Sequence, residues 1–116
     1  MCMFDKVVYI SHPYQNKTEN KDKIEDIIKT LTVKYPKYLF LSPVHSFGYL
    51  YNTVDYQIGI DYCLWLLGKA DEMWVYGDYK NSRGCLIEIK CAEESGIPYF
   101  IKERGDENDK KYDYNS

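Results

Sequence analysis

One carboxylate, Glu88, lies in the part of this chain where an α/β protein is expected to bind a ligand. The apolar run 72–76 predicts a buried strand, a polar turn follows it, and the segment 82–92 predicts a helix. Units of this kind bind ligands at the carboxyl ends of their strands, where helix N-termini favour anions. Glu88 follows Cys85 by three residues and precedes Ala92 by four, so we expect it to face inward rather than to be a solvated residue of an ordinary helix.

Two polar loops, each after a predicted strand, carry the two histidines of the chain. Their candidate ligand-binding residues are Ser11, His12, Pro13 and Tyr14 in the first loop, and His45 and Phe47 in the second loop, 42–48. Because the carboxyl ends of neighbouring parallel strands meet at one edge of a sheet, we expect the two loops to lie side by side. Either histidine could bind phosphate or sugar when protonated, or have no role, and neither has a partner at metal-ligand spacing.

Alternating strands and helices must position these groups. Apolar runs predict strands at 6–10, 38–41, 72–76 and 99–101. A helix capped by Thr18 is predicted to reach Lys34 and to end at Pro36, because isoleucine and leucine recur on one face from Ile24 to Leu31.

A further helix is predicted over 55–67, ended by Gly68, and packed on the sheet. Its apolar residues are Ile58, Tyr62, Cys63, Trp65, Leu66 and Leu67. The whole order predicts an α/β fold of the Rossmann-like kind, with a parallel sheet of four to five strands and helices on both faces in three layers.

Composition limits the function classes. The 116 residues predict one domain over 1–102, and the polar stretch 103–116 predicts a disordered tail. A net charge of −3 argues against nucleic-acid binding, because no basic stripe is present. No signal pattern or apolar run of membrane-spanning length is visible, so we expect a cytoplasmic protein without a membrane partner.

The four cysteines show no metal-binding pattern. Cys2, Cys63, Cys85 and Cys91 contain no CxxC pair and no zinc-like spacing to histidine. We therefore expect reduced, mostly buried thiols, and neither a metal nor another cofactor. Cys85 stands near a helix start, which could make its thiol more acidic, although packing is the simpler interpretation.

Three segments carry a family resemblance. They are YISHPY at 9–14, ADEMWV at 70–75, and Ser82-Arg83-Gly84 followed by Glu88 and Ala92. In order and spacing over about 1–101, the chain resembles the nucleoside 2-deoxyribosyltransferase-like superfamily, and is most similar to a largely uncharacterised bacterial and phage branch. The resemblance implies a flavodoxin-like sheet and cleavage or exchange of an N-glycosidic bond, with Glu88 as nucleophile. A carboxylate suits this step because it can capture an oxocarbenium-like carbon and release it to water or a second base.

The resemblance also suggests roles for neighbouring residues. Ser82 stands where the hydrolases of deoxynucleoside 5′-monophosphates carry serine and the transferases carry aspartate, which favours a phosphate-accepting hydrolase. Ser82, Arg83 and Gly84 would offer a hydroxyl, a charge and backbone N–H groups to phosphate, or Ser82 could act only as a helix cap. Asp61 is the nearest match to the acid that orients the sugar or leaving base.

Aromatic residues of the two loops have two interpretations each. Tyr14 could stack on a base or cover the edge of the sheet. Phe47, Tyr49 and Tyr51 beside Gly48 could form a wall for a nucleobase, a subunit contact, or both. We expect a homodimer or a larger homo-oligomer, since aromatic residues are enriched at interfaces and this superfamily commonly completes its sites across one.

Three functions therefore remain open. The first is a nucleotide N-glycosidase that acts through Glu88 on a small nucleotide or nucleoside. The second is a non-catalytic protein that sequesters a nucleotide-derived signal, as in phage counter-defence, because a retained fold does not establish retained chemistry. The third is an oligomeric scaffold with an incidental cleft.

Overall fold

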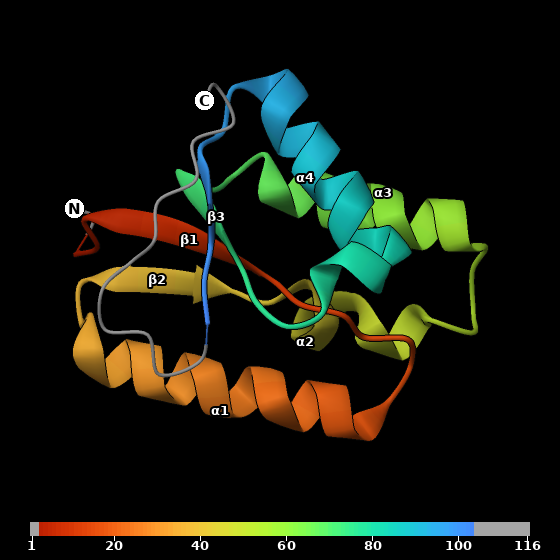
Figure 1. Ribbon diagram of the computed structural model, residues 1–116, viewed down its shortest axis with the longest axis horizontal. Helices are drawn as coiled ribbons and strands as arrows, with labels where there is room; N and C mark the ends of the chain where they lie inside the picture. Colours follow the sequence, from red (N-terminus) through yellow and green to blue (C-terminus); the bar gives the residue numbers. More distant parts are fainter. Residues whose placement is uncertain (1–2, 104–116) are drawn as a thin grey trace.

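The structure, a computed structural model, describes residues 3–103, which form an α/β fold around a parallel sheet (Figure 1). Its strands are β1 (Lys6–Ser11), β2 (Tyr38–Leu41), β3 (Glu72–Val75) and β4 (Tyr99–Ile101). They lie in the order β2-β1-β3-β4, and all three pairings are parallel. The predicted fold class is confirmed, with four strands among the described residues. The predicted tail at 103–116 lies, apart from Glu103, outside these residues.

Helices cover both faces of the sheet. The helical elements are α1 (Thr18–Lys34), α2 (Pro43–Phe47), the 3-10 turn η1 (Gly48–Leu50), α3 (Tyr56–Leu67), the 3-10 turn η2 (Tyr79–Asn81) and α4 (Arg83–Ser95). Figure 1 shows α1 below the sheet and α3 with α4 above it, which gives the three predicted layers. No helix within residues 3–103 has the length and apolar character needed to cross a bilayer.

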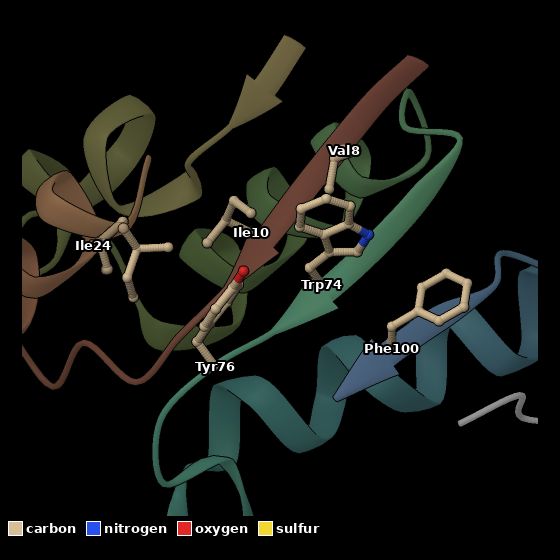
Figure 2. Packing of buried hydrophobic residues seen from close by; sticks show 7 residues of the cluster. Val8, Ile10, Ile24, Trp74, Tyr76 and Phe100 are labelled. Atoms are coloured by element: carbon tan, nitrogen blue, oxygen red, sulfur yellow. The ribbon is translucent and has the colours of Figure 1, made fainter. Parts of the chain in front are cut away.

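Strand periodicity divides the core into two clusters. Successive side chains of a strand point to opposite faces, and the register pairs Ile10 with Trp74. On the α1 face, Val8, Ile10 and Trp74 pack with Ile24 and other apolar residues (Figure 2). On the other face, a second cluster packs against α3 and α4, and its buried members are Tyr9, Leu67, Met73, Val75 and Ala92. By the same alternation, Tyr9 and Ser11 point toward α3 and α4.

Two local predictions were wrong. The segment 42–48 is not a loop, because Pro43–Phe47 form a short helix. Ser42 caps it by accepting a hydrogen bond from the His45 backbone N–H at 3.2 Å, and proline at the first helical position presets the backbone. Thr18 does not cap α1, since it is the first helical residue, and Lys17 at the cap position makes no side-chain capping bond.

The predicted inner face of the third helix was also wrong in part. Ile60 and Leu67 are its buried residues, whereas Ile58, Tyr62 and Trp65 are 44%, 46% and 64% exposed. This helix is apolar nearly all round, so its residue pattern did not define which side meets the sheet.

Candidate active site

The site is built around the Glu88 carboxylate on α4. Glu88 is 5% exposed, and both of its oxygens accept hydrogen bonds from β1. Ser11 Oγ donates to Oε1 at 2.8 Å, and the Tyr9 hydroxyl donates to Oε2. Tyr9 and Ser11 are fully buried on the same face of the strand, two positions apart. The central strand thus holds the carboxylate in one orientation.

Local sequence explains why α4 presents Glu88 to the sheet. Ser82 caps the helix by accepting a hydrogen bond from the Cys85 backbone N–H at 3.2 Å, which fixes where the helix begins. From that start, Cys85, Glu88 and Ala92 form its buried stripe, as their spacing predicts. The capping interpretation of Ser82 is therefore shown, and the residue is 6% exposed in that role.

Burial controls the charge of Glu88. Desolvation raises the pKa of Glu88 from its ordinary 4.5 to about 7, and the hydrogen bonds from Tyr9 and Ser11 oppose this rise. Within residues 3–103, no ion pair to Glu88 is present. A buried carboxylate without a cationic partner is costly to the fold, which makes Glu88 a candidate functional group.

The groups around Glu88 are held neutral. Burial first, and then the Glu88 charge, raise the pKa of Cys63 to about 12 and that of Cys85 to about 11. The same two causes raise the pKa of Tyr9 well above its ordinary value. The packing interpretation of Cys85 is therefore favoured over an acidic thiol, because burial of the thiol outweighs its place near the helix start.

A cavity of about 430 Å³ opens above Glu88 between the loop after β1, α2 and the first turns of α3 and α4. Among the candidate site residues that sequence reasoning selected, Pro13 and Tyr49 do not line this cavity, and those that do are His12, Tyr14, Phe47, Tyr51, Ser82, Arg83, Gly84 and Glu88. Ser11 lies beneath Glu88 as its hydrogen-bond donor. The structure thus brings the β1 loop and the start of α4 together around the carboxylate.

Aromatic rings form much of the cavity wall, hereafter the aromatic cavity. Tyr14 and Tyr51 meet edge to face with ring centroids 5.5 Å apart. The Arg83 guanidinium lies 4.4 Å from the centre of the Tyr56 ring. A side chain on Gly84 would begin 3.3 Å from the Tyr56 hydroxyl, so the glycine leaves room for this ring at the start of α4. Flat rings at these positions suit stacking on a planar ligand.

The two histidines have different surroundings. Burial lowers the pKa of His12, whose Nδ1 donates to the Pro13 carbonyl at 2.7 Å, so the ring is a neutral part of the wall. His45 lies outside the aromatic cavity, where its Nε2 pairs with Glu25 at 3.0 Å and its Nδ1 contacts Ser42 Oγ at 2.7 Å. His45 therefore ties α2 to α1. Within the described residues, no cluster of His, Cys, Asp or Glu could hold a metal ion.

The two acids near the start of α3 differ in placement. Asp61 is exposed, accepts a hydrogen bond from Gln57 at 2.8 Å, and does not line the aromatic cavity. Asp55, which precedes the helix, does line it. Sequence reasoning missed Asp55, although an aspartate just before a helix is a recognisable signal. It also missed Tyr9, which shares a strand face with Ser11 and could have been found from that alternation.

Comparisons with known proteins agree with this architecture. Residues 6–102 match the family described as a domain of unknown function, DUF7768. The chain belongs to this family. No curated protein sequence matches the DUF7768 chain.

A solved structure shares the fold of this DUF7768 protein. It is the 2-deoxyribosyltransferase of Bacillus psychrosaccharolyticus, with a TM-score of 0.58 and 18% sequence identity. The match covers 84% of this chain and 72% of the transferase chain. This structural similarity supports the predicted resemblance at the level of the fold.

Proposed function

We propose that this protein cleaves or exchanges the base–sugar bond of a nucleoside or nucleotide, with Glu88 as nucleophile. The observation that carries the proposal is the buried Glu88 carboxylate, which has no ion pair within residues 3–103 and lies at the floor of the aromatic cavity. The fold shared with a 2-deoxyribosyltransferase supports the same chemistry.

The reaction has two steps. A Glu88 oxygen bonds to the anomeric carbon while the C–N bond breaks, and the base leaves with the electron pair of that bond. Water or a second base then attacks the same carbon and restores the carboxylate. Tyr9 and Ser11 each hold one carboxylate oxygen, which positions Glu88 without blocking its remaining lone pairs.

Binding of the nucleoside would use the wall of the aromatic cavity. Tyr14, Tyr51 and Tyr56 offer ring faces and edges to a base. Asp55 replaces Asp61 as the acid that orients the base or sugar, because Asp61 points to solvent. A 5′-phosphate would be held by Arg83, by backbone N–H groups at the start of α4 and by the Ser82 hydroxyl, whose proton is not used when its oxygen accepts the capping bond.

The alternative is a protein that binds a nucleotide without cleaving it. The exposed position of Asp61 favours this alternative, since the acid expected from the resemblance is not at the cavity. The raised pKa of Glu88 also leaves a large share of the carboxyl protonated at neutral pH, when it is not a nucleophile.

We also propose that the protein forms a homodimer through the exposed side of α3. Ile58, Tyr62 and Trp65 lie along one stripe there, and the Phe47 ring meets Tyr62 edge to face at 5.4 Å. Light scattering of the wild type is expected to give the mass of a dimer, and Trp65→Ser is expected to shift it toward the monomer. A monomeric wild type would refute this assembly.

The test of function is release of free base from pooled ribo- and deoxyribonucleosides and their 5′-phosphates, followed by chromatography and mass spectrometry. Wild type is expected to release base, and Glu88→Gln to lower the rate by roughly a thousandfold. Glu94→Gln is the matched control, because Glu94 is an exposed acid on the same helix. Recovery of an intact nucleotide from both wild type and Glu88→Gln, with no base released, would favour the binding protein.

A further inference from the structure

A second cavity of about 650 Å³ adjoins the aromatic cavity on the other side of the loop after β1. It lies among the first turns of α1, the turn after β3 and the residues that follow β4, and we refer to it as the polar cavity. His12, Gln15 and Asn81 line both cavities. These three side chains are therefore a shared boundary, and a ligand that passes them would reach both spaces.

The two cavities differ in chemistry. The polar cavity is lined by three lysines, Lys17, Lys23 and Lys102, and by three acids, Glu19, Asp78 and Glu103. Lysine ammonium groups bind phosphate oxygens, while carboxylates and side-chain amides accept and donate hydrogen bonds with sugar hydroxyls. An equal number of both charges suits a ligand that combines phosphate with sugar better than a bare polyanion.

Charges of the polar cavity act on the shared boundary. The Lys23 ammonium is close enough to His12 to lower the pKa of the imidazole, after the larger effect of burial. Because His12 Nδ1 donates to the Pro13 carbonyl, the neutral ring has an acceptor at Nε2. That nitrogen lies 3.0 Å from where a side chain on Gly77 would begin, so the turn after β3 closes tightly on the ring. Lys23 thus offers a cation at the passage, whereas the neutral His12 ring has no free N–H for a phosphate and only borders it.

A second of the three boundary residues, Asn81, is already oriented. Asn81 Nδ2 donates to both oxygens of Asp78, at 3.1 and 2.9 Å. This pairing holds together the segment between β3 and α4. It therefore fixes one side of the passage between the cavities.

We propose that the ligand occupies both cavities and is a nucleoside 5′-diphosphate that carries a second sugar, the chemical class of dinucleotides and diphosphate sugars. The inference rests on the proposed function for the placement of the nucleoside half at Glu88. The diphosphate passes His12 and Asn81 toward Lys23, and the second sugar meets the acids and amides of the polar cavity. The bond cleaved is the base–sugar bond of the half at Glu88, by the two steps given above.

The test compares ligands of increasing length on the same base. Calorimetry with Glu88→Gln, which keeps the ligand intact, would use adenosine, AMP, ADP and ADP-ribose, and also nicotinamide riboside, nicotinamide mononucleotide and NAD. In at least one series the longest ligand is expected to bind at least about tenfold more tightly than the 5′-monophosphate, whose single phosphate Arg83 already holds in the aromatic cavity. A gain that is complete at the monophosphate, or equal affinity along both series, would overturn the proposal.

Charge reversal in the polar cavity provides the second arm. Lys23→Glu, in the Glu88→Gln background, is expected to remove the gain of about tenfold while nucleoside affinity stays unchanged. Lys21→Glu is the matched control, because Lys21 is an exposed lysine on the same turn of α1 that lines neither cavity. A gain that survives Lys23→Glu would overturn the proposal.

The experiments can refute either proposal without refuting the other. Base release that depends on Glu88 but is equally fast for nucleosides and diphosphate sugars would refute the extended ligand and leave the glycosidase. Tight binding of a diphosphate sugar that depends on Lys23, without release of base from any compound, would refute the glycosidase and leave the extended ligand.

Discussion

The two faces of the sheet differ in what they bury. The face toward α1 packs Val8, Ile10 and Trp74 among other apolar side chains, which is what stability alone would favour. The face toward α3 and α4 also buries apolar residues, but it holds Tyr9 and Ser11 against a carboxylate and two thiols. Strand β1 contributes side chains to both faces. Its apolar side chains are explained by stability, whereas the buried polar groups around Glu88 are not, which points to a function for them.

A large effect on stability alone is expected on the face toward α1. Ile24→Ala would remove a side chain that is 1% exposed and leave a cavity, which lowers the free energy of unfolding by about 3 kcal/mol. Denaturant unfolding measures this loss. Base release per folded molecule should stay unchanged at temperatures where the variant is folded, and a proportional loss of activity would break the separation of the two faces.

An effect of similar size is the pH dependence of stability on the face toward α3 and α4. The pKa of Glu88 is raised in the folded state, so the unfolded protein loses its proton first. The contribution is therefore fully favourable below about pH 4.5, falls as pH rises to about 7 and is then constant. A pKa difference of about 2.5 corresponds to roughly 3 kcal/mol.

Unfolding curves of wild type and Glu88→Gln measure this effect from pH 4 to 8. The difference between the two proteins should change with pH by that amount, the wild type losing stability relative to the variant as pH rises. A constant difference would show that Glu88 is not desolvated as the structure describes.

Tyr9→Phe gives a smaller effect that tests positioning. The variant removes one donor to Glu88, and since that bond lowers the Glu88 pKa, its loss should move the acidic limb of the pH–rate profile upward. Activity near pH 7 should fall by roughly tenfold to a hundredfold. Tyr49→Phe, on a ring that is 77% exposed, is the control. A uniform loss of activity at all pH values would indicate a structural role only.

The smallest effect compares the two acids near the start of α3. Asp55→Asn is expected to lower kcat/KM by about tenfold, because Asp55 lines the aromatic cavity. Asp61→Asn should leave it unchanged, because Asp61 only accepts a hydrogen bond from Gln57 at the surface. The reverse result would restore the assignment that the sequence resemblance suggested.

Periodic features could be predicted from the sequence, and features set by tertiary contacts could not. The strand runs and the inward stripe of Cys85, Glu88 and Ala92 follow from local repeats of two and of three to four residues. The bonds from Tyr9 and Ser11 to Glu88 join residues 79 and 77 positions apart, so they depend on strand register and helix offset.

Where local patterns were ambiguous, prediction failed for physical reasons. The third helix is apolar on several sides, so its inner face was misplaced, and Asp61 was assigned to the cavity in place of Asp55. The helix after Ser42 was missed although Ser-Pro is a helix-start signal. The polar cavity could not be predicted, because its residues come from separate segments of the chain.

The most direct test of the central claim is to trap the covalent intermediate on Glu88. The protein would be mixed with substrate, quenched within one turnover and digested, and the peptide that contains Glu88 would be weighed by mass spectrometry. A glycosyl adduct is expected on this peptide in the wild type, and none is expected in Glu88→Gln. Base release without any such adduct, and at an undiminished rate in Glu88→Gln, would contradict this claim.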